Sequence, residues 1–72
     1  MYQTIEVKKD HWVMVNDIST FEYNDVEDTT IFTLKRRGIY YKCKGNIVKR
    51  VNNFLASGAV AIDRHGNLQQ RR

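Results

Sequence analysis

The side chains that most readily perform acid–base catalysis are scarce in this chain, which has two histidines, His11 and His65. An imidazole that acts as a general acid or base needs a nucleophile or a carboxylate beside it in a shared cleft. Asp63 precedes His65 by two residues, and the segment 63–67 has a superficial likeness to a fragment of a nuclease motif. No complete nuclease motif accompanies it, and its composition is that of a tight turn. We therefore expect a protein that is not an enzyme.

The single cysteine, Cys43, lies between Lys42 and Lys44. Neighbouring cations lower the pKa of an exposed thiol and make it reactive. The sequence gives no separate evidence of a base that would work with this thiol, so we expect it to be buried or idle. One cysteine forms neither an intramolecular disulfide nor a zinc-binding pair, and a reducing cytoplasm is the expected location.

Acidic side chains gather in one segment of the chain. They are Glu22, Asp25, Glu27 and Asp28. Their spacing is not that of a calcium-binding loop, which also requires a glycine. We expect a solvated acidic loop that holds no metal, and no cofactor is indicated elsewhere. A second role stays open for this loop, as a dock for a basic partner or for the basic half of a second copy.

The most informative global feature is the distribution of charge along the 72 residues. Residues 1–34 hold two basic and seven acidic side chains, a net charge of −5, whereas residues 35–72 hold ten basic and one acidic, a net charge of +9. Clustered charge of one sign attracts polyanions. The C-terminal half is therefore predicted to bind nucleic acid, either DNA or RNA. The alternative is that the two halves neutralise each other across one compact domain.

A helix predicted over residues 46–57 offers the first candidate surface for nucleic acid. Its polar face carries Lys49, Arg50 and Asn53, with no acidic residue. Arginine pairs with guanine through two hydrogen bonds, asparagine pairs in the same way with adenine, and lysine contacts phosphate. Any solvated helix carries such residues, so a plain solvent-facing helix is the alternative interpretation.

A hairpin predicted over residues 29–43 offers the second candidate surface. It and the residue that follows it place an aromatic ring among cations, at Arg36, Arg37, Tyr40, Lys42 and Lys44. Stacking of a base on such a ring contributes roughly 1–3 kcal/mol, and the cations add a salt-dependent attraction. Arg64, in the turn at 63–67, completes the predicted nucleic-acid-binding set. A packing role for the tyrosine is the alternative.

Hydrophobic periodicity predicts the elements that position these residues. Alternating and β-branched residues predict strands at residues 2–7, 12–15, 18–23, 29–34, 39–43, 59–62 and 68–70. An apolar stripe at helical spacing, which Asn46 caps and Gly58 ends, consists of Ile47, Val48, Val51, Phe54 and Leu55. The predicted fold class is α+β: a single domain of residues 1–72 with a small antiparallel sheet of four to six short strands, open or barrel-like, and one helix packed on it.

The hairpin also predicts a strand register. If Arg36, Arg37 and Gly38 form a three-residue loop, Leu34 lies opposite Tyr40, and Phe32 lies opposite Lys42. The expected core partners of the helix are Trp12, Val13, Val15, Ile18, Phe21, Ile31, Leu34 and Ile62.

A chain this short builds a small core, and one core below roughly 70–80 residues rarely supplies more than about 3–5 kcal/mol of stability. With no disulfide or metal indicated, self-association as a homodimer is the expected supplement. No stretch reaches the roughly 20 apolar residues of a membrane-spanning helix, so no membrane partner is expected.

Residues 12–55 resemble the first part of LytTR-type DNA-binding domains, and small FlbD-like flagellar proteins show a similar order of elements. The shared positions are Val13, Val15, Asp17, Ile18, Glu22, Thr30, Ile31, Gly38, Tyr40 or Tyr41, Ile47, Val51 and Leu55. The resemblance implies an α+β fold and DNA binding. The later basic segment of the family has no counterpart beyond Ile62, so no DNA-contacting residue is carried over.

Two functions remain open on this basis. The first is a small non-catalytic regulatory protein that binds nucleic acid through its basic half. The second is a compact inhibitor or adaptor, of the kind that phages and mobile elements encode, that docks on a larger host protein.

Overall fold

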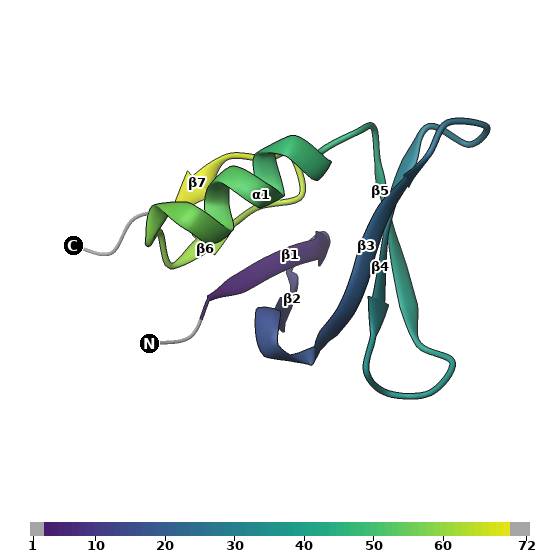
Figure 1. The fold of residues 1–72 in the computed structure, drawn as a ribbon, viewed down its shortest axis with the longest axis horizontal. Coiled ribbons are helices and arrows are strands. Elements are labelled where there is room, and N and C mark those ends of the chain that lie inside the picture. The colour runs from purple at the N-terminus through teal and green to yellow at the C-terminus, as the bar shows by residue number, and fades with distance from the viewer. Residues whose placement is uncertain (1–2, 70–72) are drawn as a thin grey trace.

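A computed structural model describes residues 3–69 and has one helix and two β-sheets (Figure 1). The elements are β1 (Thr4–Lys8), β2 (His11–Met14), the 3-10 turn η1 (Val15–Asp17), β3 (Ile18–Asn24), β4 (Thr29–Leu34), β5 (Tyr40–Lys44), α1 (Val48–Ser57), β6 (Ala61–Ile62) and β7 (Leu68–Gln69). The predicted α+β class is confirmed. The strands of the described part form two sheets, ordered β2–β1–β6–β7 and β3–β4–β5, and not a closed barrel.

Pairing within the sheets is antiparallel except for β1 and β6, which run parallel. The parallel pair exists because α1 carries the chain from the end of the second sheet back to the first (Figure 1). The helix packs against β3 and β6. The last predicted strand is present as β7, and its predicted end at Gln70 lies outside the described residues.

The predicted register of the β4–β5 hairpin is wrong by one residue. The N–H of Leu34 donates to the carbonyl of Ile39 at 3.0 Å, so the loop has four residues, 35–38, and not three. Gly38 takes the predicted left-handed conformation, with φ 75°. Tyr40 therefore lies opposite Thr33, and Phe32 opposite Tyr41.

This shift determines which side chains reach the core. Phe32 and Cys43 point inward and are buried, whereas Tyr40 is 57% exposed on the outer face. Because side chains alternate along a strand, Lys42 shares the outer face with Tyr40. Tyr40 and Lys42 share a face in either register, and the longer loop pairs them with Thr33 and Ile31 of β4 in place of Leu34 and Phe32.

The core lies between the two sheets and the helix. Its most deeply buried side chains are Ile5, Val7, Thr30, Phe32, Val51, Phe54 and Ile62. Four of the predicted core partners, Val13, Val15, Ile18 and Phe21, are half-buried against it. Two are wrong: Trp12 is 44% exposed, and Ile31 points to the outer face because of the register shift. Leu34 is half-buried at the end of β4.

The helix begins at Val48, two residues later than predicted. The side chain of Asn46 still accepts a hydrogen bond from the N–H of Val48 at 3.2 Å. The Thr30 hydroxyl accepts a second one from the N–H of Ile47 at 3.0 Å, which anchors the helix start to β4. Gly58 ends the helix with φ 80°, as predicted.

Candidate nucleic-acid interface

Three segments far apart in the sequence meet at a basic hollow of about 250 Å³. They are the end of β1 with the β1–β2 turn, strand β5 and the β6–β7 turn. The lining residues are Val7, Lys8, Lys9, Lys42, Cys43, Lys44, Arg64 and His65. Five of these side chains are cationic at neutral pH. We call this feature the basic hollow.

Two buried residues, Val7 and Cys43, form the apolar part of the lining. Cys43 is 4% exposed, and its thiol donates to the carbonyl of Val7 at 3.2 Å. Burial raises the pKa of this thiol to about 11. The thiol therefore stays protonated at neutral pH and joins β5 to β1.

One buried carboxylate fixes the two turns that border the basic hollow. Glu6 is 6% exposed, and it accepts hydrogen bonds from the N–H of Asp10 at 3.0 Å and from the N–H of Arg64 at 3.2 Å. The Arg64 guanidinium lies 3.4 Å from the same carboxylate. These backbone hydrogen bonds, the one from Asp10 first, hold the pKa of Glu6 below its usual value. Glu6 is thus ionised at neutral pH and positions both turns.

The β6–β7 turn is shaped by a second carboxylate, as the turn prediction for residues 63–67 requires. Asp63 accepts hydrogen bonds from the N–H of His65 at 2.9 Å and from that of Asn67 at 2.8 Å. From the helix, the Arg50 guanidinium donates to the carbonyl of His65 at 2.8 Å. This arginine therefore supports the turn from the side of α1.

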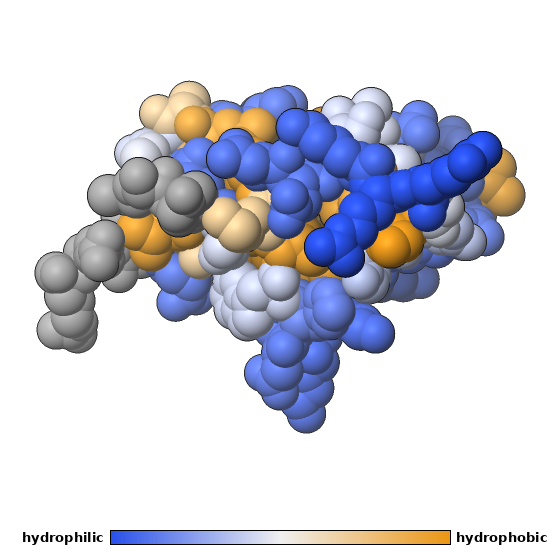
Figure 2. Space-filling view, turned by 90° about the horizontal axis from the view of Figure 1, so that it is seen from below, coloured by the Kyte–Doolittle hydropathy of each residue, from blue (hydrophilic) through white to orange (hydrophobic). Residues whose placement is uncertain are grey.

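Only part of the predicted site comes together. Lys42, Lys44 and Arg64 meet in the basic hollow. Lys49 and Asn53 lie on the exposed face of α1, as expected. Arg36, Arg37 and Tyr40 lie elsewhere: the two arginines occupy the β4–β5 loop, and the ring lies on the outer sheet face. Figure 2 looks onto the side of the molecule from which this loop extends, where hydrophilic side chains project.

Sequence reasoning missed three polar residues of the basic hollow, Lys8, Lys9 and His65. The two lysines belong to residues 1–34, which have a net negative charge. Because charge was summed separately over the two halves of the chain, these lysines were not counted with the basic residues. The signal that could have found them is the Lys-Lys-Asp turn, because a turn exposes adjacent side chains.

Oppositely charged residues from the two halves of the chain also meet, since Lys42 pairs with Glu27 at 2.8 Å. The hydrogen bond from Lys42 to Glu27 raises the pKa of the lysine.

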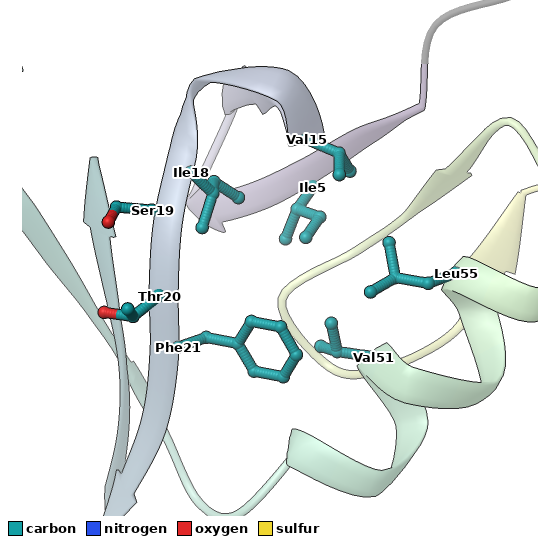
Figure 3. Close-up of a pocket in the computed structure, with 8 residues that line it drawn as sticks. All are labelled: Ile5, Val15, Ile18, Ser19, Thr20, Phe21, Val51 and Leu55. Atoms are coloured by element: carbon teal, nitrogen blue, oxygen red, sulfur yellow. The ribbon is translucent and has the colours of Figure 1, made fainter. Parts of the chain in front are cut away.

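A different hollow, of about 400 Å³, opens between α1 and β3. Figure 3 shows apolar side chains pointing into it, from Ile5, Val15, Ile18, Phe21, Val51 and Leu55. Ser19 and Thr20 also border it, but their side chains point away. None of the described residues that line this hollow, which we call the apolar cleft, is charged.

Within residues 3–69, no three potential metal ligands lie close enough together to hold an ion, and no helix has the length and apolar character needed to cross a membrane. Comparisons with protein-family models, with curated proteins and with solved structures found no match to this chain.

Proposed function

We propose that the protein is a small non-catalytic regulatory protein that binds nucleic acid through the basic hollow. The observation that carries the proposal is that five cationic residues from three separate segments line one concavity, and two of them, Lys42 and Arg64, are also paired with carboxylates. Lysine and arginine that neutralise phosphates release condensed counterions, which favours binding in proportion to the number of contacts. The carboxylate of Glu6 holds two of the three segments in place, so the cations are arranged before the ligand arrives.

The test is a titration of labelled duplex DNA, single-stranded DNA and RNA at about 50 and 200 mM salt. Five phosphate contacts set an upper bound for the slope of log K against log salt, about −4.5 for duplexes and about −3.5 for single strands. Binding with a slope equivalent to several contacts supports the proposal. No binding at the lower salt contradicts it.

A matched pair of variants locates the surface. Lys9→Glu with Lys44→Glu reverses two charges inside the basic hollow, and Arg37→Glu with Lys49→Glu reverses two charges outside it. We expect the first pair to abolish binding and the second to weaken it slightly. The opposite ranking, in variants that are shown to be folded, would transfer the binding surface to the loop or the helix.

The apolar cleft favours a second candidate function, that of an adaptor or inhibitor docking on a larger protein. A cleft of about 400 Å³ with an uncharged lining suits an apolar side chain of a partner. Affinity capture before and after nuclease treatment separates the two functions. A stoichiometric protein that survives nuclease supports the adaptor, whereas captured material that disappears supports nucleic-acid binding.

A further inference from the structure

We propose that the ligand is a single-stranded nucleic acid, with one base stacked on Tyr40 and the neighbouring phosphates in the basic hollow. This inference rests on the proposed function and specifies its substrate class. It derives from a second concavity, which the basic hollow adjoins.

That concavity, the outer groove, lies on the outer face of the β3–β4–β5 sheet and has a volume of about 710 Å³. Its apolar lining includes Ile31 and Ile39, and Tyr40 forms part of its wall. Tyr40 is 57% exposed, so its side chain is accessible to a ligand. An accessible aromatic side chain at the wall of a groove can stack on a planar base.

Lys42 connects the outer groove to the basic hollow, because it lines both. Its ammonium nitrogen lies 6.0 Å from the centre of the Tyr40 ring. Strand β5 is an edge strand of its sheet in the described structure, so a chain can pass around it from one face to the other. A strand whose base rests on Tyr40 therefore meets Lys42 and then Lys44 with its backbone.

The charges of the two concavities assign base and phosphate to different places. Glu27 lines the outer groove and pairs with Lys42 there. A carboxylate repels phosphate but tolerates a neutral base. The basic hollow has the opposite character, because besides Lys42 its described lining has four further cationic residues and no carboxylate. We thus assign the base to the outer groove and the phosphates to the basic hollow.

Stacking on Tyr40 requires an unstacked base, which selects single strands. In a duplex each base is already stacked between its neighbours and paired, whereas the bases of a single strand can turn toward an aromatic side chain. A duplex can use only the cations and loses the contribution of the ring.

The experiment compares three labelled probes at one salt concentration: an oligothymidylate, an abasic single strand of the same length and a duplex. We expect the oligothymidylate to bind about 5- to 150-fold more tightly than the abasic strand, the range of one stacked base. Tyr40→Ala should abolish this difference and leave the salt slope unchanged, while Tyr40→Phe should preserve both. Trp12→Ala removes an exposed aromatic ring outside both concavities and should change neither.

Each other outcome has a distinct meaning. Equal binding of the oligothymidylate and the abasic strand, or an unchanged preference in Tyr40→Ala, overturns the inference but leaves the proposed function standing. Tighter binding of the duplex than of both single strands also overturns the inference alone. The absence of binding to all three probes at low salt overturns the proposed function and the inference together.

Discussion

The carboxylate of Glu6, in β1, accepts the backbone N–H of Arg64 at 3.2 Å and lies 3.4 Å from its guanidinium, although 58 residues separate the two in sequence. The same carboxylate accepts the N–H of Asp10 at 3.0 Å. One buried side chain therefore connects the β1–β2 turn to the β6–β7 turn. Both turns carry cations of the basic hollow, so this carboxylate couples the stability of the fold to the geometry of the candidate interface.

The first prediction concerns the pH dependence of stability. The pKa of Glu6 is lowered in the folded protein, chiefly by the hydrogen bond from Asp10 and then by that from Arg64, below its ordinary value of 4.5. A carboxyl with a depressed folded pKa stabilises the fold above its unfolded pKa, and this contribution is lost as the pH falls through the folded value. We expect the denaturation midpoint to fall on acidification below about 4.5.

Glu6→Gln tests whether the Glu6 carboxylate causes this loss of stability at acidic pH. Glutamine retains the size of the side chain and one carbonyl acceptor but has no charge. We expect a lower denaturation midpoint at neutral pH and a weaker loss of stability below the pKa of the wild-type carboxyl. Identical pH profiles for the two proteins would show that Glu6 does not contribute to the acid response.

The second prediction distinguishes direct contact between phosphates and the basic hollow from attraction by the net charge of the protein. Lys44→Gln, in the basic hollow, should make the salt slope for single strands less negative by about 0.7, the equivalent of one phosphate contact. Lys49→Gln removes the same charge from the exposed face of α1 and should leave the slope unchanged. Equal changes in the two variants would mean that the protein attracts nucleic acid by its overall field and not through the basic hollow.

The third prediction concerns Gly66, at the centre of the β6–β7 turn. Its φ is 87°, and a Cβ atom there would lie 2.5 Å from Cδ of Arg50. Gly66→Ala should therefore cost about 1–2 kcal/mol for the left-handed backbone and, in addition, displace the arginine from the His65 carbonyl. Chemical denaturation measures the total loss in the free energy of unfolding.

Gly38→Ala is the control for this variant. Gly38 also has a positive φ, 75°, but nothing lies within 4 Å of the added Cβ. The difference between the two losses of stability thus reports the Arg50 contact. Equal losses, or an unchanged difference after Arg50→Ala is introduced into both proteins, would show that the arginine does not support the turn.

The fourth prediction tests the core. Phe54 is fully buried on the inner face of α1, and truncation of such a ring costs about 3–5 kcal/mol. A domain of this size has about that much stability in total, so Phe54→Ala should be largely unfolded. Leu55, which is 37% exposed at the apolar cleft, should tolerate alanine far better. Circular dichroism at increasing denaturant concentration distinguishes the two.

The sequence predicted local structure better than long-range arrangement. Strand β4 has the predicted limits, residues 29–34, because β-branched residues mark it, and Gly58 ends the helix because only the left-handed conformation is needed there. The hairpin register was wrong because loops of three and four residues fit the same run Lys35–Gly38. One hydrogen bond, from Leu34 to Ile39, distinguishes them, and no local pattern encodes it.

The candidate site was predictable only where its residues are neighbours in sequence. Lys42 and Lys44 were found together because they lie two residues apart on one face of a single strand. Lys8 and Lys9 were missed because β1 meets β5 through tertiary packing. This packing includes the hydrogen bond from the Cys43 thiol to the carbonyl of Val7. Charge counted along the chain cannot detect such a meeting of segments.

The last prediction concerns the ion pair between Glu27 and Lys42, whose side chains are 48% and 41% exposed. In the free protein the Glu27 carboxylate is paired with the Lys42 ammonium group, which a phosphate of the ligand would contact. Nucleic acid must therefore displace the carboxylate. Glu27→Gln should therefore tighten binding, and a pair this exposed limits the gain to roughly 1.5- to 5-fold. Asp25→Asn is the matched control, because it removes the same charge from the same loop and Asp25 has no ion pair among the described residues. An equal gain in both variants would indicate general repulsion by the acidic loop. A gain confined to Glu27→Gln, which disappears when Lys42→Gln is added, would show that Lys42 itself is the cation released to the ligand.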